Sequence, residues 1–182
     1  ATSIFSSVDE ILSLMMKRFG GYWRYPKILD FCYLVNPYFP PKKLKEEMMA
    51  SFDVLLTEYP SGMHINSLLA AKAFSVHEEN IAVGNGAAEL IKVLMEGIEG
   101  NIGFIRPTFE EYPNRIEKER AVVYCPENNN FSYNEYDLIE YFSEKDISTL
   151  VVINPDNPTG SYIKKEGLFR LISWSEEKGI TL

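Results

Sequence analysis

A glycine-rich turn at residues 84–89 is the first segment whose residue types suggest binding chemistry. It reads Gly-Asn-Gly-Ala-Ala-Glu and joins a short apolar run to a predicted helix. Glycines let a backbone approach an anion closely, and the first N–H groups of a helix lack intrahelical partners. Together with the positive end of the helix dipole, such a turn can bind phosphate. Taken alone, the turn is better explained as a plain strand-to-helix connection, because single glycine-rich turns are weak signals.

Two further segments directly follow predicted strands. Residues 106–109 read Arg-Pro-Thr-Phe, with Tyr112 close behind, and residues 154–160 read Asn-Pro-Asp-Asn-Pro-Thr-Gly. An aromatic side chain at the carboxyl end of a parallel strand can stack on a planar ligand. The two prolines of the second segment favour a rigid turn, which can aim an amide side chain at a ligand oxygen. The simpler alternatives are a core aromatic beneath a loop and an ordinary tight turn.

Several other classes of site do not fit the sequence. A dinucleotide fingerprint would have Gly or Ala at the position of Glu89, and the Gly-Lys-Ser/Thr of a P-loop is absent. Neither a disulfide framework nor a zinc-binding spacing can be built from the two cysteines, Cys32 and Cys125. His64 and His77 are the only histidines, which leaves little room for histidine-rich metal chemistry, and we expect no metal site.

The charge balance and the apolar runs limit the possible partners. The chain has 18 Lys and Arg residues against 26 Asp and Glu residues, a net charge of -8, which disfavours binding to nucleic acid or to an acidic membrane surface. We see no run long enough for a transmembrane helix and no signal-peptide pattern at the N-terminus. We therefore expect no nucleic acid or membrane partner, and the lack of a disulfide framework makes a cytoplasmic setting the default.

The elements that must position these segments alternate between two periodicities. Helical spacing of apolar residues predicts six helices, at residues 7–19, 41–55, 65–76, 86–98, 136–142 and 166–178. Short apolar runs predict strands at residues 81–83, 102–105, 121–124, 149–153 and from 180 onward. In the helix 86–98 we expect Leu90, Leu94 and Ile98 to share one face, with Ile91 and Met95 beside them. Strands that alternate with helices indicate an α/β domain with a mostly parallel sheet.

Five segments, in this order and spacing, resemble one enzyme family. They are Asn36-Pro37-Tyr38, Tyr59-Pro60, Asn85 to Glu89, Pro107-Thr108-Phe109 and Asn157-Pro158-Thr159-Gly160. The set is similar to the fold-type-I aminotransferases of class I/II that use pyridoxal 5'-phosphate (PLP), and especially to histidinol-phosphate aminotransferases. The resemblance extends from about Leu29 to Leu182, with one departure at Ala88, where the family usually has Asp. Because that loop binds largely through its backbone, the departure weakens the match little.

The resemblance implies a fold and a division of the chain. The fold would be the α/β, three-layer αβα large domain of these PLP transferases, truncated and preceded by an N-terminal arm. Residues 1–60 would form the arm and the small-domain helices. Residues 61–182 would form the N-terminal part of the PLP-binding large domain.

The resemblance also assigns roles to individual residues. The backbone N–H groups of Gly86, Ala87 and Ala88 would bind the PLP phosphate, Phe109 would stack on the pyridine ring, and Asn157 would hydrogen-bond to the ring hydroxyl oxygen. Tyr59 would reach the phosphate of the neighbouring subunit's PLP, which implies a homodimer. Asn36 would lie near the substrate carboxylate, and Tyr22 in the arm would contact the substrate or pack on the partner subunit.

The resemblance places no catalytic residue within the chain. In the family, the lysine that holds PLP and moves the proton lies downstream, and so does the carboxylate that pairs with the pyridine nitrogen. None of the lysines matches that position, and the carboxylate would follow the strand that begins at Ile180. We therefore expect an N-terminal portion of an enzyme, which is inactive without the remainder.

The expected activity is transamination between an amino acid or amino-phosphate donor and a 2-oxo acid acceptor. A related branch decarboxylates threonine phosphate, and its early motifs look much the same, so that reaction stays open. A non-catalytic dimerisation module with the PLP fold is a further alternative. The segment 30–38 also resembles aminotransferase modules fused behind a nucleotidyltransferase. A nucleotide-binding α/β protein is disfavoured by Glu89 and by the missing P-loop lysine.

Overall fold

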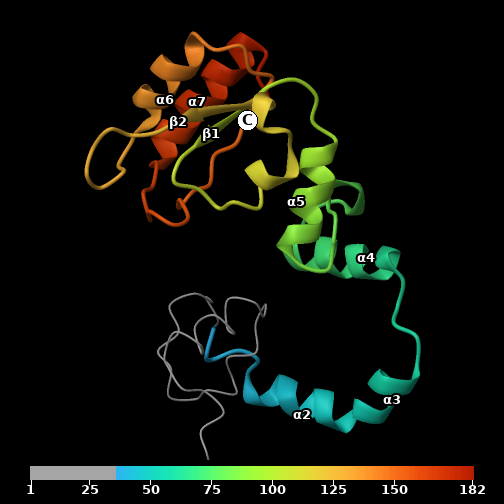
Figure 1. Cartoon of the computed structure of the whole chain (residues 1–182). Helices are drawn as coiled ribbons and strands as arrows, with labels where there is room; N and C mark the ends of the chain where they lie inside the picture. Colours follow the sequence, from blue (N-terminus) through green and yellow to red (C-terminus); the bar gives the residue numbers. More distant parts are fainter. Residues whose placement is uncertain (1–35) are drawn as a thin grey trace, which may run out of the picture. The chain divides into compact units, whose positions relative to one another are not determined.

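The computed structural model describes residues 36–182, drawn in colour in Figure 1. The chain divides into two compact units, residues 1–60 and 61–182, and each unit is described by itself. The predicted helix 7–19 and Tyr22 lie outside the described residues. No helix among residues 36–182 is both long and apolar enough to span a membrane.

The described part of the first unit consists of two short helices, α2 (Lys42–Ala50) and α3 (Phe52–Thr57). The sequence predicts one continuous helix here, and that prediction is wrong at Ser51. This residue caps α2 and then opens α3, because its N–H donates to the Glu47 oxygen at 3.2 Å while its own oxygen accepts from Leu55 at 2.9 Å. Neither helix contains a buried residue.

The second unit is built on a parallel sheet, as the sequence predicts, with three named strands. These are β1 (Ile102–Ile105), β2 (Ala121–Tyr124) and β3 (Thr149–Leu150), in the order β2-β1-β3. The strand predicted at residues 149–153 is shorter than expected and ends at Leu150. Ile102 pairs with Ala121 on one side and with Thr149 on the other. Thr181 forms a further parallel bridge to Thr149, so the chain re-enters the sheet beside β3 at its end.

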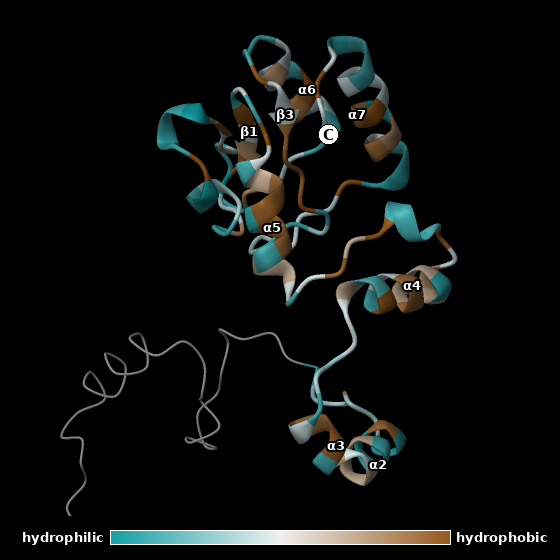
Figure 2. Ribbon diagram, turned by 90° about the vertical axis from the view of Figure 1, so that its right-hand side faces the viewer, coloured by the Kyte–Doolittle hydropathy of each residue, from teal (hydrophilic) through white to brown (hydrophobic). Residues whose placement is uncertain are grey.

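Helices cover both faces of this sheet, which confirms the three-layer αβα arrangement (Figure 1). Helix α5 (Ala87–Glu96) packs on one face, where its buried residues Ile91 and Met95 meet Ile102 and Phe104. Helices α6 (Glu135–Ser143) and α7 (Lys165–Lys178) cover the opposite face. In Figure 2, hydrophobic segments in brown alternate with hydrophilic ones along α5, α6 and α7, as burial of one helix face requires.

Close approach of α6 to the sheet depends on a glycine in the central strand. A Cβ atom on Gly103 would lie 2.8 Å from Phe142 of α6 and 2.9 Å from Leu150 of β3. Both of those side chains are fully buried. Position 103 therefore has room only for glycine unless this core moves apart.

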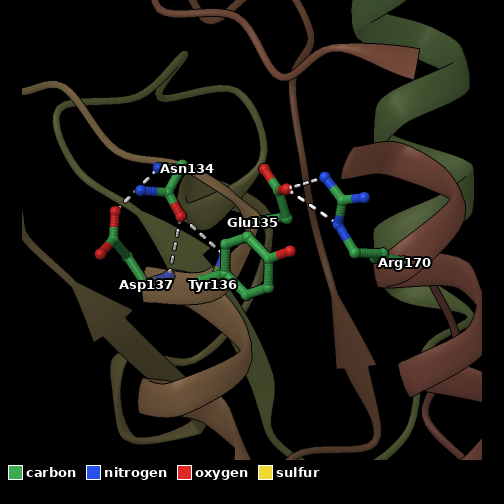
Figure 3. A network of polar contacts seen from close by, with 5 residues as sticks. All are labelled: Asn134, Glu135, Tyr136, Asp137 and Arg170. Atoms are coloured by element: carbon green, nitrogen blue, oxygen red, sulfur yellow. Dashed lines mark hydrogen bonds and ion pairs between the residues drawn. The ribbon is translucent and has the colours of Figure 1, made fainter. Parts of the chain in front are cut away.

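Helix α6 begins with a capping box (Figure 3). The Asn134 side chain accepts hydrogen bonds from the N–H groups of Tyr136 at 2.8 Å and Asp137 at 3.3 Å, and Asp137 accepts one from the Asn134 N–H at 2.8 Å. The buried Glu135 carboxylate reaches across to α7 and accepts a hydrogen bond from Arg170 Nε at 3.0 Å. These contacts fix the start of α6 and tie it to α7.

One detail of the sequence prediction around α5 is wrong. Residues 81–83 form no strand, because none of the described strands lies beside them to supply a hydrogen-bond ladder. On α5, the side chains that face the sheet are Ile91 and Met95, whereas Leu90 and Leu94 are 39% and 59% exposed. The preceding helix, α4 (Met63–Phe74), and the short turn η2 (Glu78–Asn80) complete this part of the unit.

Candidate cofactor site

The start of α5 has the backbone conformation that an anion site requires. Gly86 is the N-cap residue and has φ 90° and ψ 164°, a region that essentially only glycine adopts. No side chain caps the helix, so the N–H groups of its first turn stay available. A Cβ atom on Gly86 would meet no atom within 4 Å, so open space lies in front of this turn. The turn therefore fits a phosphate group.

Glu89 stabilises the same turn from within. Its carboxylate accepts a hydrogen bond from the Asn85 N–H at 2.5 Å. It also lies beside Gly84, where an added Cβ would come within 3.0 Å of its oxygen. The Glu89 carboxylate thus holds the loop closed, and its negative charge is favourable at the start of a helix.

The far end of α5 is tied to the amino-terminal edge of the sheet. The Arg120 side chain, just before β2, donates to the Gly100 oxygen at 2.8 Å, and the Ser148 hydroxyl, just before β3, donates to the Glu99 oxygen at 2.5 Å. Because α5 leads directly through this loop into β1, its other end lies toward the carboxyl ends of the strands. The phosphate-binding turn is therefore directed to the edge where ligands bind in open α/β sheets.

Phe109 lies in the loop that follows the carboxyl end of β1, and its ring lies against the ring of Tyr112. The two rings meet edge to face, with centroids 6.3 Å apart and planes inclined by 74°. Tyr112 in turn packs against the cluster of Ile91 and Met95 beneath α5. Phe109 itself keeps 38% of its surface exposed, so a ligand ring can reach it. The pair thus forms an aromatic platform after the carboxyl end of β1.

Asn157 stands in the loop that follows β3. The loop is closed at its base by Asn154, whose side chain accepts from the Ile163 N–H at 2.8 Å and donates to the Ile163 oxygen at 3.1 Å. Within the loop, the buried Asp156 carboxylate accepts a hydrogen bond from the Thr159 hydroxyl. Asn157 is exposed, and its side chain is free to meet a ligand.

The structure thus brings together the predicted residues of the second unit at one edge of the sheet. Gly86, Ala87 and Ala88 lie at the start of α5, and Phe109 and Asn157 follow the neighbouring strands β1 and β3. In Figure 1 the segments after β1 and β3 leave the sheet on the same side. This is the arrangement that the sequence predicts for a cofactor, although the role of each residue stays a prediction.

The two predicted residues of the first unit are described within that unit alone. Asn36 accepts a hydrogen bond from the Tyr38 N–H at 2.9 Å and forms a local turn. Tyr59 is fully exposed. Their roles toward substrate and toward a neighbouring subunit stay predictions, as does that of Tyr22.

Sequence reasoning gave no role to the residues that hold Asn157 in place. Asn154 and Asp156 belong to the same segment, but the motif draws attention to Asn157 alone. A usable signal was present, since Asp followed by Thr three residues later and then Gly is typical of side-chain-closed turns. Tyr133 lies near Asp156. Burial and the negative charge of Asp156 raise the pKa of the Tyr133 hydroxyl well above its usual range.

Comparisons with known proteins agree with this geometry. A family model described as aminotransferase class I and II matches residues 26–182. A CMP-5'-(3-aminopropyl)phosphonate synthase of Streptomyces rubellomurinus is 32% identical over 92% of the chain, which spans 26% of that protein. An L-serine phosphate decarboxylase of Sulfurospirillum multivorans is 32% identical over 79% of the chain, which spans 39% of it.

A histidinol-phosphate aminotransferase of Thermococcus gammatolerans is 32% identical over 75% of the chain, and the match covers 41% of that protein. The solved structure of a decarboxylase from Sulfurospirillum multivorans superposes with a TM-score of 0.70 and 28% identity, over 84% of the chain and 42% of that structure. The chain therefore spans between about a quarter and two fifths of the length of these relatives.

Proposed function

Because the chain belongs to the aminotransferase class I and II family, with the fold-type-I PLP transferase fold, we propose that the complete protein is a PLP-dependent enzyme. The observation that carries the proposal is the meeting of three features at one sheet edge. These are the open, uncapped start of α5, the exposed ring of Phe109 and the exposed amide of Asn157. Each suits a different part of PLP.

The described residues fit this cofactor. The N–H groups of Gly86, Ala87 and Ala88 would hold the phosphate, helped by the dipole of α5. Phe109 would support one face of the pyridine ring, and Asn157 would donate a hydrogen bond to the ring hydroxyl oxygen. When bound, PLP supplies an electron sink for negative charge at the α carbon of an amino substrate.

We further propose that the substrate is an amino compound with a phosphate or phosphonate group. The relatives named above are a serine phosphate decarboxylase, an aminopropylphosphonate synthase and a histidinol-phosphate aminotransferase. Each of these names refers to an amine that carries a phosphate or phosphonate group. Of the two donor classes that the sequence suggests, this supports the amino-phosphate over an amino acid without a phosphorus group.

Two reactions remain candidates, and they differ in which bond to the α carbon breaks. Decarboxylation breaks the bond to the carboxylate, and transamination breaks the C–H bond. The decarboxylase relative matches slightly more of the chain than the aminotransferase relative does, 79% against 75%. Its structural counterpart also superposes well. We therefore place decarboxylation first and keep the expected transamination, with a 2-oxo acid acceptor, as the second candidate.

The remaining parts of the proposal concern the complete protein. The lysine that holds PLP would lie outside residues 1–182, which the partial coverage of the relatives supports. A homodimer would form if Tyr59 reaches a neighbouring site. A fused nucleotidyltransferase domain is supported by the CMP-5'-(3-aminopropyl)phosphonate synthase. Its name includes a nucleotide, and the chain covers only 26% of that protein, which leaves room there for a further domain.

Product analysis with O-phospho-L-serine tests the reaction. The complete protein, loaded with PLP, is incubated with this substrate with and without 2-oxoglutarate. Decarboxylation releases CO2 and O-phosphoethanolamine in either case, whereas transamination yields more than one equivalent of the 2-oxo acid per bound PLP only when the acceptor is present. L-Serine is the matched control, because it lacks only the phosphate. Faster turnover of L-serine than of phosphoserine would contradict the proposed substrate class.

A further inference from the structure

Asp156 occupies an unusual place in the loop after β3. It is only 6% exposed, although it lies directly before the exposed Asn157. Carboxylates are rarely buried to this degree unless hydrogen bonds satisfy them. Its partner is the Thr159 hydroxyl, two residues beyond Asn157. A buried carboxylate and a hydroxyl thus bracket the residue that would bind the cofactor.

The backbone of Asp156 closes the same turn. Its N–H donates to the Ser161 oxygen at 2.7 Å, and its carbonyl oxygen accepts from the Gly160 N–H at 2.9 Å. The Thr159 hydroxyl also accepts from the Ser161 N–H at 3.1 Å, so it links the Asp156 carboxylate to the part of the loop after Gly160. Side chain and backbone together leave residues 157 and 158 as the tip of a closed turn.

We propose that Asp156 is a positioning residue that, through Thr159, holds the turn from which Asn157 binds the ring hydroxyl oxygen of PLP. The inference rests on the proposed function and deepens it, since it names what aims Asn157. Asp156 does not itself touch the cofactor. An amide that is held in one place loses less entropy on binding than an amide on a mobile loop, and its hydrogen bond is correspondingly stronger.

The ionisation of the bound cofactor reports on this role. A hydrogen bond donated to the ring hydroxyl oxygen favours its ionised form and lowers its pKa. That pKa is measured from the absorbance of the PLP-loaded complete protein as pH is varied. N157A should raise it by about half a unit to one unit, the worth of one hydrogen bond. D156A and T159V should raise it in the same direction by a smaller amount.

Conservative and control variants separate positioning from general damage. D156N and T159S keep an acceptor and a hydroxyl in place, and both should retain the original pKa. S161A removes a hydroxyl whose 3.4 Å contact is with the Phe131 oxygen, outside the Asp156 turn, and should change nothing. If D156A fails to fold, T159V still tests the proposal, because it leaves the carboxylate in place and removes the hydroxyl that links Asp156 to Ser161.

A double variant decides whether Asp156 acts through Asn157. In the N157A background, D156A should cause no further shift of the cofactor pKa. If N157A shifts the pKa while D156A and T159V, both folded and PLP-bound, do not, the positioning role is overturned and the proposed function stands. If the unaltered protein binds no PLP, the proposed function falls, and the positioning role falls with it.

Discussion

The ring of Phe109 meets the ring of Tyr112 edge to face, with centroids 6.3 Å apart, at the point where β1 gives way to a loop. Tyr112 is anchored against the core beneath α5, while Phe109 remains partly exposed. The pair therefore couples the platform for a planar ligand to the same hydrophobic cluster that holds the phosphate-binding helix.

Loss of the Tyr112 ring should weaken PLP binding. Such aromatic pairs contribute about 0.5–1.5 kcal/mol, so Y112A should raise the dissociation constant of PLP by about 2- to 10-fold. Y112F keeps the ring and should bind like the unaltered protein. Fluorescence titration with PLP measures both. An unchanged dissociation constant in Y112A would show that Phe109 needs no support from its neighbour.

Gly86→Ala should damage both the fold and the phosphate site. Position 86 has φ 90° and ψ 164°, and a side chain there costs about 1–3 kcal/mol. Gly62 is a matched control, because it is also a helix N-cap with open space around it but has φ -64°. Thermal unfolding should show a lower Tm for G86A than for G62A, and PLP titration a weaker affinity. Equal Tm values and affinities would contradict the assignment of position 86.

Met95→Ala should destabilise the second unit strongly. Met95 has no exposed surface and packs between α5 and β1, and such truncations cost about 2–5 kcal/mol of unfolding free energy. Lys92→Ala, on the exposed side of the same helix, should change stability by no more than about 0.5 kcal/mol. Denaturant unfolding of the complete protein measures both. A loss below about 1 kcal/mol for M95A would mean that α5 does not pack as described.

Glu135 should make stability depend on pH in the acid range. Its hydrogen bond with Arg170 and the backbone hydrogen bond of its own residue hold the pKa of the Glu135 carboxyl below its usual value. The contribution to stability is therefore full above the unfolded-state pKa and is lost as pH falls through the folded-state pKa.

E135Q tests this sign. It should be less stable than the unaltered protein at pH 7, and the difference in Tm should shrink as pH falls below about 4.3, the usual glutamate pKa. E144Q, at the exposed C-cap of α6, is the control and should show no such convergence. A constant difference in Tm from pH 7 to pH 3 would refute the role of the Glu135–Arg170 pair.

Much of the second unit could be predicted from local sequence patterns. The strands 102–105 and 121–124 have the predicted bounds, because short apolar runs between turn residues are unambiguous there. The end of α7 follows from Gly179, whose φ of 69° is the left-handed conformation that glycine favours. These features depend on residues close together in sequence.

Other features could not be predicted because they depend on distant partners. Residues 81–83 look like a strand, but a strand needs a neighbour, which the local pattern does not reveal. Periodicity places two adjacent apolar rows on α5, and only the sheet decides that Ile91 and Met95 face inward. The burial of Asp156 likewise arises from how the whole loop folds, so only its neighbour Asn157 stood out in the sequence.

The most direct test of the central claim is to locate the lysine that PLP modifies. The complete protein is loaded with PLP, reduced with borohydride, digested and analysed by mass spectrometry. If residues 1–182 hold the phosphate, ring and hydroxyl of PLP but not its carbonyl carbon, one modified lysine should appear, in a peptide outside residues 1–182. A stoichiometric adduct on a lysine within residues 1–182, or no adduct at all, would contradict the account.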